Sequence, residues 1–181
     1  MEQKDKLEGE RIYLRLMTQE DTELIVFWRN EDFVRENFIY RKPFTREGHL
    51  NWIRTQIVPG HVVQLMICLK EDDTPVGSVY FRDIDREHRK AEYGIFIGVK
   101  EALGIGIGTE AARLAVRYAF DELGLHRIML RVLANNPRAK RSYEKAGFVE
   151  EGRFRDDVYL DGQFQDVIFM GMVNPKERRN V

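Results

Sequence analysis

The sequence predicts a domain of mixed α/β (α+β) class, in which a mostly antiparallel sheet is flanked by helices. Alternating apolar and polar residues at 11–17 are typical of a half-buried strand, and runs rich in β-forming residues follow from residue 62 onward. Other stretches place their apolar residues at helical spacing. The order is strand, two helices, three strands, helix, strand, helix and two strands, which predicts about seven strands and about four helices.

The N-terminal part predicts one strand and two helices. Residues 11–17 carry apolar side chains at every second position, which indicates the first strand. Thr18 with Asp21 three positions later resembles a capping box, so a helix is expected to follow. Thr45 is a suitable N-cap for the second helix, and the Pro-Gly pair at 59–60 ends it.

Turn and cap residues mark the elements that follow. Gly124 and Gly147 are expected to close helices, and the Asp-Gly pair at 161–162 predicts a hairpin. The expected strands span residues 62–69, 75–84, 91–99, 127–133, 148–159 and 164–172, and the expected helices span residues 109–123 and 137–146.

Length and composition predict a single domain, residues 1–181, with a core of residues 10–173 and a polar, solvated tail at 174–181. Lys and Arg total 29 and Asp and Glu total 30, so no strong net field favours nucleic acid or an anionic membrane as partner.

The same features predict a cytoplasmic protein without a metal. Cys68 is the single cysteine and lies in an apolar run, which is typical of a core thiol in a reducing compartment. No run approaches the roughly 18 apolar residues of a membrane helix, and the charged N-terminus is unlike a signal peptide. The four histidines are scattered, and no metal-ligand spacing is present.

A glycine-rich loop at residues 103–109 follows a β-type run and precedes a helix. Backbone without side chains can approach a ligand closely there, and N–H groups at a helix N-terminus favour phosphate. Glycines at this place also serve turns and close packing, so both interpretations are open. Gly106, Gly108 and Ala111 fit a dinucleotide-binding fingerprint as well, but no acidic residue ends the next strand to hold a ribose.

Four segments taken in order carry a more specific signal: residues 91–98, 104–111, 136–139 and 143–148. Together they closely resemble the GNAT superfamily of N-acetyltransferases, and the resemblance extends from Arg11 to Met172. The branch they resemble most contains the bacterial ribosomal-protein N-terminal acetyltransferases. The resemblance implies a GNAT fold with a central twisted sheet, and acetyl-coenzyme A as co-substrate.

The resemblance also assigns residues to the coenzyme. It implies that backbone groups of Phe96, Ile97 and Gly98 pair with the pantetheine arm as another strand would. It also implies that the glycine-rich loop at residues 103–109 binds the pyrophosphate. The family usually has a basic or aromatic residue at Leu103 and often a basic one at Ile105, so weaker binding through backbone N–H groups is expected. The implied coenzyme residues are Phe96, Ile97, Gly98, Leu103, Gly104, Ile105, Gly106, Ile107, Gly108, Thr109, Asn136 and Tyr143.

Two residues are expected to take part in catalysis. Acetyl transfer needs a neutral amine and a proton for the departing thiolate. Tyr143, with an ordinary pKa of about 10, can give a proton to the thiolate. The alternative is that its side chain only packs one face of a short helix. The resemblance implies that Glu92 is the candidate base, acting directly or through water, because the matching glutamate acts so in some members of the family; a partly solvated strand carboxylate is the equal alternative. Asn136 before Pro137 also suits an N-cap.

The acceptor amine is not identified by the sequence. The resemblance implies that the two early helices border the acceptor site, so Trp28, Arg29, Arg35 and His49 are candidate substrate residues. The arginines suit a phosphate or carboxylate and the tryptophan a stacked ring, but a core tryptophan with surface arginines is an alternative that also explains them.

Three functions therefore stay open: an enzyme for protein N-termini or small amines, an enzyme for amino-nucleotide sugars, and a non-catalytic acyl-coenzyme A sensor. The oligomeric state is expected to be a monomer or homodimer.

Overall fold

One continuous sheet of eight strands organises residues 6–177, which are the residues described by this computed structural model. Its strand order is β1-β2-β3-β4-β5-β6-β8-β7, and every neighbouring pair is antiparallel except β5 and β6. The strands are β1 (Leu7–Glu8), β2 (Ile12–Leu16), β3 (Val63–Leu69), β4 (Pro75–Asp85), β5 (Lys90–Ile97), β6 (Arg127–Leu133), β7 (Val149–Leu160) and β8 (Gln163–Val173).

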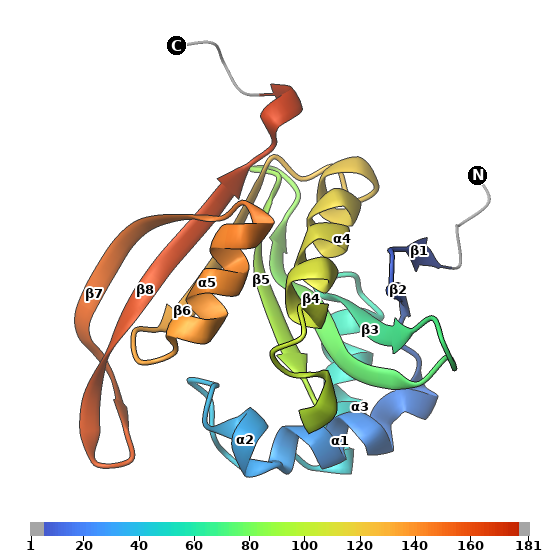
Figure 1. The fold of residues 1–181 in the computed structure, drawn as a ribbon, viewed down its shortest axis with the longest axis horizontal. Coiled ribbons are helices and arrows are strands. Elements are labelled where there is room, and N and C mark those ends of the chain that lie inside the picture. Colours follow the sequence, from blue (N-terminus) through green and yellow to red (C-terminus); the bar gives the residue numbers. More distant parts are fainter. Residues whose placement is uncertain (1–5, 178–181) are drawn as a thin grey trace.

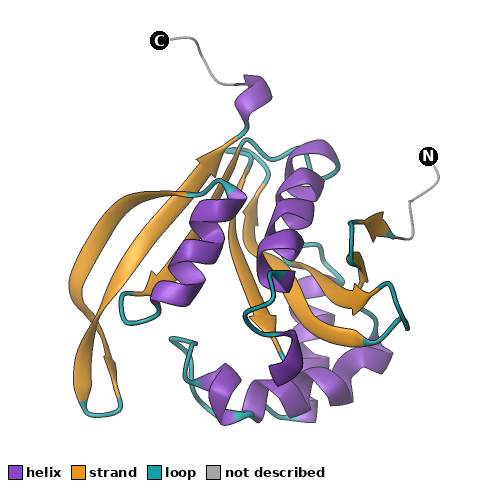
Figure 2. Cartoon of the chain, viewed as in Figure 1, coloured by secondary structure: helices purple, strands orange, loops and turns teal. Residues whose placement is uncertain are grey.

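Helices cover both faces of the sheet (Figure 2). In Figure 1, α4 and α5 lie on the near face, and α1 to α3 lie lower, against the other face. The helices are α1 (Thr22–Asn30), α2 (Asp32–Arg35), α3 (Arg46–Trp52), α4 (Ile107–Asp121) and α5 (Pro137–Ala146). Among the described residues, no helix is long and apolar enough to cross a membrane.

The predicted fold class is confirmed, with two additions. The two-residue strand β1 and the single-turn helix α2 were missed, because both are too short to show a period in the sequence. The second predicted helix continues past α3 as one π-helical turn, Ile53–Ile57.

Most of the predicted caps and turns are confirmed. The Thr45 hydroxyl accepts a hydrogen bond from the Gly48 N–H at 3.0 Å. Gly147 closes α5 with a φ of 105°. Asp161 and Gly162 both have positive φ, 50° and 80°, as a type I′ hairpin turn requires.

The expected solvated tail is wrong at its first residue. Asn174 is buried, and its side-chain oxygen accepts a hydrogen bond from the Lys176 N–H. Glu177 then pairs with Arg89 at 2.7 Å, which fastens the short helix Pro175–Glu177 to the body of the protein. Residues 178–181 lie outside the described part of the chain.

Two hydrophobic clusters lie on opposite faces of the sheet. The larger one packs α4 against apolar side chains of β2 to β6 and β8. The smaller one packs α1 and α2 against the other face and contains Trp28, Cys68 and Phe96. Cys68 is fully buried, as the sequence predicts.

The parallel pair β5–β6 is short, and this shapes the molecule. Its ladder runs only from Lys90 opposite Arg127 to Glu92 opposite Met129. Beyond that point β5 stays paired with β4 as far as Ile97, and β6 stays paired with β8 as far as Leu133. The two strands therefore diverge and leave facing edges without a ladder partner.

A carboxylate fixes the start of α4 to the start of β2. Glu110 Oε1 accepts hydrogen bonds from the backbone N–H groups of Glu10 and Arg11 at 2.7 and 2.9 Å. The Arg11 Nε donates to Oε2 at 3.2 Å, and Arg11 Nη1 donates to the Ile105 carbonyl at 2.7 Å. One ion pair thus holds the N-terminal strand, the glycine loop and α4 together.

Replacing Glu110 by Gln is predicted to reduce stability in a pH-dependent way. Burial opposes ionisation of Glu110, but backbone N–H groups and Arg11 outweigh it and hold the pKa below its ordinary value of 4.5. This stabilisation is complete above about pH 4.5 and is lost as the pH falls through the lower pKa of the folded state. We expect the substitution to cost about 1–2 kcal/mol at pH 7 and to cost less near pH 3.

Urea unfolding at the two pH values checks this prediction, with the exposed Glu122→Gln as the matched control. A loss that does not change with pH would show that the charge of Glu110 has no part in it.

Candidate active site

A cleft of about 430 Å³ opens where β5 and β6 diverge. Its walls come from α2 and the loop that follows it, from β4, β5 and β6, from the glycine loop, and from α5. The cleft therefore reaches from one face of the sheet to the other. A molecule that enters it contacts the free edge of β5 on its way.

The free edge of β5 offers backbone hydrogen bonds. Gly98 N–H donates to the Val76 carbonyl at 2.8 Å, on the β4 side. Because the direction of backbone groups alternates along a strand, the N–H and C=O groups of Ile95 and Ile97 point away from β4 and toward the cleft. Phe96 and Ile97 line the cleft. Gly98 does not, because Trp28 lies against it: an added Cβ would come within 2.2 Å of that ring.

The glycine loop ends at the N-terminus of α4, on the wall of the cleft. Gly104 and Gly106 have φ values of 77° and 92°, a left-handed backbone that favours glycine. Leu103, Gly104, Gly106, Gly108 and Thr109 line the cleft. The side chains of Ile105 and Ile107 do not: Ile105 is exposed and Ile107 belongs to the core.

Tyr143 lies on α5 with its ring facing the cleft. Its ring packs edge-to-face on Tyr93 and Phe148, with centroid distances of 6.3 and 6.1 Å. Burial raises the pKa of Tyr143 above its ordinary value of 10, so the hydroxyl keeps its proton at neutral pH. The predicted packing role and a proton-donor role are therefore compatible.

Both the oxygen and the nitrogen of the Asn136 side-chain amide form hydrogen bonds. Its Oδ1 accepts a hydrogen bond from the Ala139 N–H at 3.1 Å, which confirms the predicted N-cap. Its Nδ2 donates to Asn37 Oδ1 at 2.7 Å. Asn37 lies after α2, so this bond joins the two sides of the cleft.

Glu92 is the centre of an ion-pair cluster rather than a solvated strand carboxylate. Its Oε1 accepts from Arg82 Nη2 at 2.7 Å and from Arg131 Nε at 3.1 Å. Its Oε2 accepts from Arg131 Nη2 at 3.3 Å. All three side chains line the cleft, on the face of the sheet that α1 and α2 cover.

None of the four candidate substrate residues lines the cleft. Trp28 is 2% exposed and packs edge-to-face on Phe96, so the core interpretation holds for this residue. His49 is also buried, with a pKa lowered to about 4 by burial, and contacts the Thr22 hydroxyl at 3.2 Å. Arg35 pairs with Asp32 at 2.6 Å on the surface.

Arg29 is not the surface charge that the alternative interpretation expects. Its guanidinium carbon lies 3.4 Å from the centroid of the Phe38 ring, which is a cation–π contact, and burial lowers the pKa of the guanidinium. Phe38 in turn lines the cleft. Arg29 thus lies behind the cleft wall.

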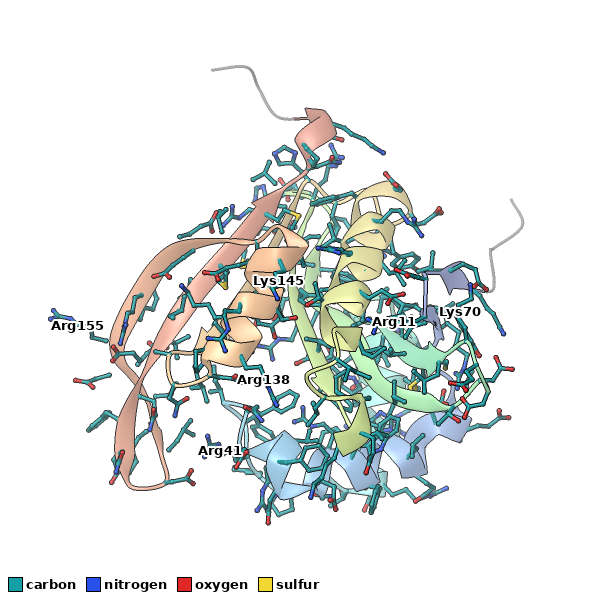
Figure 3. The ribbon with its side chains drawn as sticks, in the orientation of Figure 1. Arg11, Arg41, Lys70, Arg138, Lys145 and Arg155 are labelled. Atoms are coloured by element: carbon teal, nitrogen blue, oxygen red, sulfur yellow. The ribbon has the colours of Figure 1, made fainter. Side chains whose placement is uncertain are left out.

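Several cleft residues escaped the sequence analysis. Arg138, Arg141 and Lys145 line the cleft from α5. Their spacing of three and four residues places them on one helical face, a pattern that the sequence does contain. Figure 3 shows Arg138 below the N-terminal end of α5 and Lys145 further along the helix. The pair Arg82 and Arg131 carried no signal, because only the register of β4 and β6 brings them to Glu92.

A close contact shapes the floor of the cleft. Tyr80 lies opposite Gly94 in the β4–β5 ladder, and its ring crosses the glycine: an added Cβ would meet the Tyr80 ring and hydroxyl at 2.2 to 2.5 Å. Gly94 is therefore required by packing and not by a left-handed backbone. Among residues 6–177, no three His, Cys, Asp or Glu side chains gather as a metal site.

The family match and the relatives found by sequence comparison are all named as acetyltransferases. Residues 11–149 match the family described as Acetyltransferase (GNAT) domain. The Bacillus subtilis protein named "Probable N-acetyltransferase YjcK" is 34% identical over 96% of this chain and 99% of its own length. The protein named "Putative ribosomal N-acetyltransferase YdaF", of the same species, is 35% identical over 56% of this chain. The Vibrio cholerae spermidine N(1)-acetyltransferase is 38% identical over 56% of it. The chain spans 55% and 58% of the lengths of these last two.

Solved structures agree with this. The spermidine N-acetyltransferase from Vibrio cholerae, in complex with CoA and spermine, has a TM-score of 0.85 and 26% sequence identity to this chain. The match covers 91% of this chain and 96% of that one.

Replacing Gly94 by Ala is predicted to cost about 1–3 kcal/mol, because the new methyl group displaces the Tyr80 ring. In a Tyr80→Ala background the same change should cost less than about 0.5 kcal/mol, since the clash is then absent. Urea unfolding of the four variants of this double-mutant cycle measures both values, and Gly152→Ala, which meets nothing within 4 Å, is the control. Equal costs in the two backgrounds would contradict the contact.

Proposed function

The chain belongs to the GNAT family of acetyltransferases and is an acetyl-coenzyme A-dependent N-acetyltransferase, and we propose that its acceptor is a small-molecule primary amine. The observation that supports the proposal is the cleft between β5 and β6, which opens on both faces of the sheet with Tyr143 in its wall. Acetyl-coenzyme A enters from the side of α4 and α5, and the amine enters from the side of α1 and α2. The two substrates meet in a ternary complex.

Backbone and cationic groups hold the coenzyme in this proposal. The pantetheine arm pairs with the free N–H and C=O groups of Ile95 and Ile97, as a strand would. The pyrophosphate lies at the N–H groups of the glycine loop. Arg138, Arg141 and Lys145 supply the cations that Leu103 and Ile105 lack, so backbone contacts are not the sole source of affinity.

The reaction is a direct attack. The neutral amine attacks the thioester carbonyl, a C–N bond forms, and the C–S bond breaks as the tetrahedral intermediate collapses. The amine proton leaves to Glu92 Oε2, directly or through a water. The Tyr143 hydroxyl gives a proton to the thiolate of coenzyme A. Arg82 and Arg131 hold the Glu92 carboxylate in one orientation.

A small amine fits the cleft better than an extended peptide. The Asn37–Asn136 hydrogen bond crosses the cleft, and Arg41, in the loop after α2, pairs with Asp161 at the tip of the β7–β8 hairpin. The first contact bridges two residues of the cleft lining, and the second ties the loop after α2 to the hairpin, whereas a protein N-terminus needs an open groove. An acyl-coenzyme A sensor would have no use for the enclosed Tyr143 hydroxyl, and it would release no free thiol.

Replacing Tyr143 by Phe is predicted to lower kcat by about 10- to 100-fold and to change acetyl-coenzyme A affinity little, because only the proton donor is lost. Thiol release and calorimetry measure the two effects. Tyr159→Phe, on the exposed hairpin, is the control. Unchanged kcat would remove Tyr143 from the mechanism.

Replacing Glu92 by Gln is predicted to lower kcat by about 100-fold or more, because the amide cannot accept the amine proton. The pH profile of kcat/KM should also lose its acidic limb. Glu122→Gln, on the surface of the protein, should leave both unchanged. A variant that keeps the acidic limb would show that another group, or the amine itself, sets it.

A further inference from the structure

The cleft has an unbalanced charge. Its lining holds five cationic side chains and a single carboxylate, Glu92. Three of the five cations lie on α5, where the proposed coenzyme phosphates need them. The other two, Arg82 and Arg131, lie on the sheet, and both form ion pairs with Glu92. We call the part of the cleft around these three side chains, on the face that α1 and α2 cover, the acceptor end. The lining of this end of the cleft therefore holds two guanidinium groups and one carboxylate, while Asp83, which pairs with Arg82 at 3.7 Å, is 79% exposed and lies outside the lining.

Both arginines keep hydrogen-bonding capacity. Arg82 binds Glu92 through Nη2, and Arg131 binds it through Nε and Nη2. Among the hydrogen bonds of residues 6–177, the Nη1 groups of both donate to no protein acceptor. The two side chains are about one-third exposed, at 34% and 32%, so a ligand in the cleft can reach them. Two adjacent guanidinium groups with free donors match an oxyanion.

Arg29 is a further positive charge, behind the wall of the cleft. It is stacked on Phe38 and takes part in none of the ion pairs of the described residues. Phe38, on which Arg29 is stacked, lines the cleft together with Tyr40 and Tyr80. In a partly buried setting such a charge is screened less than on the surface.

We infer that the acceptor is an amine that also carries an oxyanion, a carboxylate or a phosphate, which Arg82 and Arg131 bind while the amine faces Glu92 and the thioester. This inference rests on the proposed function and narrows its substrate class. Arg82 on β4 and Arg131 on β6 flank Glu92 on β5, so one short molecule can reach both kinds of group. A polyamine has the wrong charge for this end of the cleft, although relatives of the chain are named for spermidine.

Matched acceptor pairs test the inference in a thiol-release assay. An amino acid is compared with its carboxamide, and glucosamine 6-phosphate with glucosamine; spermidine is the cationic reference. We expect kcat/KM for the anionic member of at least one pair to exceed that of its neutral partner by 10-fold or more, and to exceed that of spermidine. The pair that responds identifies the oxyanion as carboxylate or phosphate.

Variants then assign the preference to the arginines. Arg131→Gln should bring the ratio between the anionic and neutral partners close to one, and Arg131→Lys should retain part of it. Acetyl-coenzyme A affinity, measured by calorimetry, separates this effect from misfolding. Arg155→Gln, whose side chain projects away from the body in Figure 3, is the control for a general loss of positive charge and should keep the full ratio.

The inference is overturned if neutral amines or spermidine are acetylated as fast as the anionic partners, or if Arg131→Gln keeps the preference. In both cases thiol is still released, so the proposed function stands. Failure to release thiol with any amine, with acetyl-coenzyme A bound, would instead contradict the proposed function itself.

Discussion

The molecule depends on one constraint: β5 and β6 pair for three residues and then separate. The divergence of a parallel pair costs free energy, because the backbone N–H and C=O groups along two strand edges lose their hydrogen-bond partners. Each of the two strands keeps an antiparallel partner on its other edge: β5 pairs with β4, and β6 pairs with β8. These ladders hold β5 and β6 in the sheet where the two strands diverge. A substrate that supplies hydrogen bonds along the open edge completes the sheet, and this gives a physical reason for a coenzyme arm to bind there.

The separation also divides the chemistry between the two faces of the sheet. On one face, α4 and α5 present a glycine loop and a row of cations. On the other face, glycines at 94 and 98 let Tyr80 and Trp28 lie directly on β5, so aromatic rings form the floor and back of the acceptor end. Tyr143 lines the cleft between the two faces, where the proposed reaction transfers the acetyl group.

The sequence predicted what depends on local pattern. Alternating apolar residues located the first longer strand, runs of β-forming residues and flanking turns located the other six, and Thr45, Asn136, Gly147 and the turn at 161–162 were identified by capping and turn chemistry. Trp28 and His49 were predicted as substrate residues from the place of the two early helices in the resemblance, and the sequence had no signal for the packing against Gly98 and Thr22 that buries both side chains. The Arg82–Glu92–Arg131 cluster joins three strands, and only their register, which has no local signal, brings those charges together.

Amide hydrogen exchange along β5, followed by NMR with and without saturating coenzyme A, tests the central claim most directly. The account predicts that coenzyme A slows exchange at Ile95 and Ile97, whose N–H groups face the gap. Gly94 and Phe96, which face β4, should change little because the ladder already protects them. Equal effects on both sets, or no effect at Ile95 and Ile97 with coenzyme A bound, would contradict binding of the coenzyme arm along the open edge of β5.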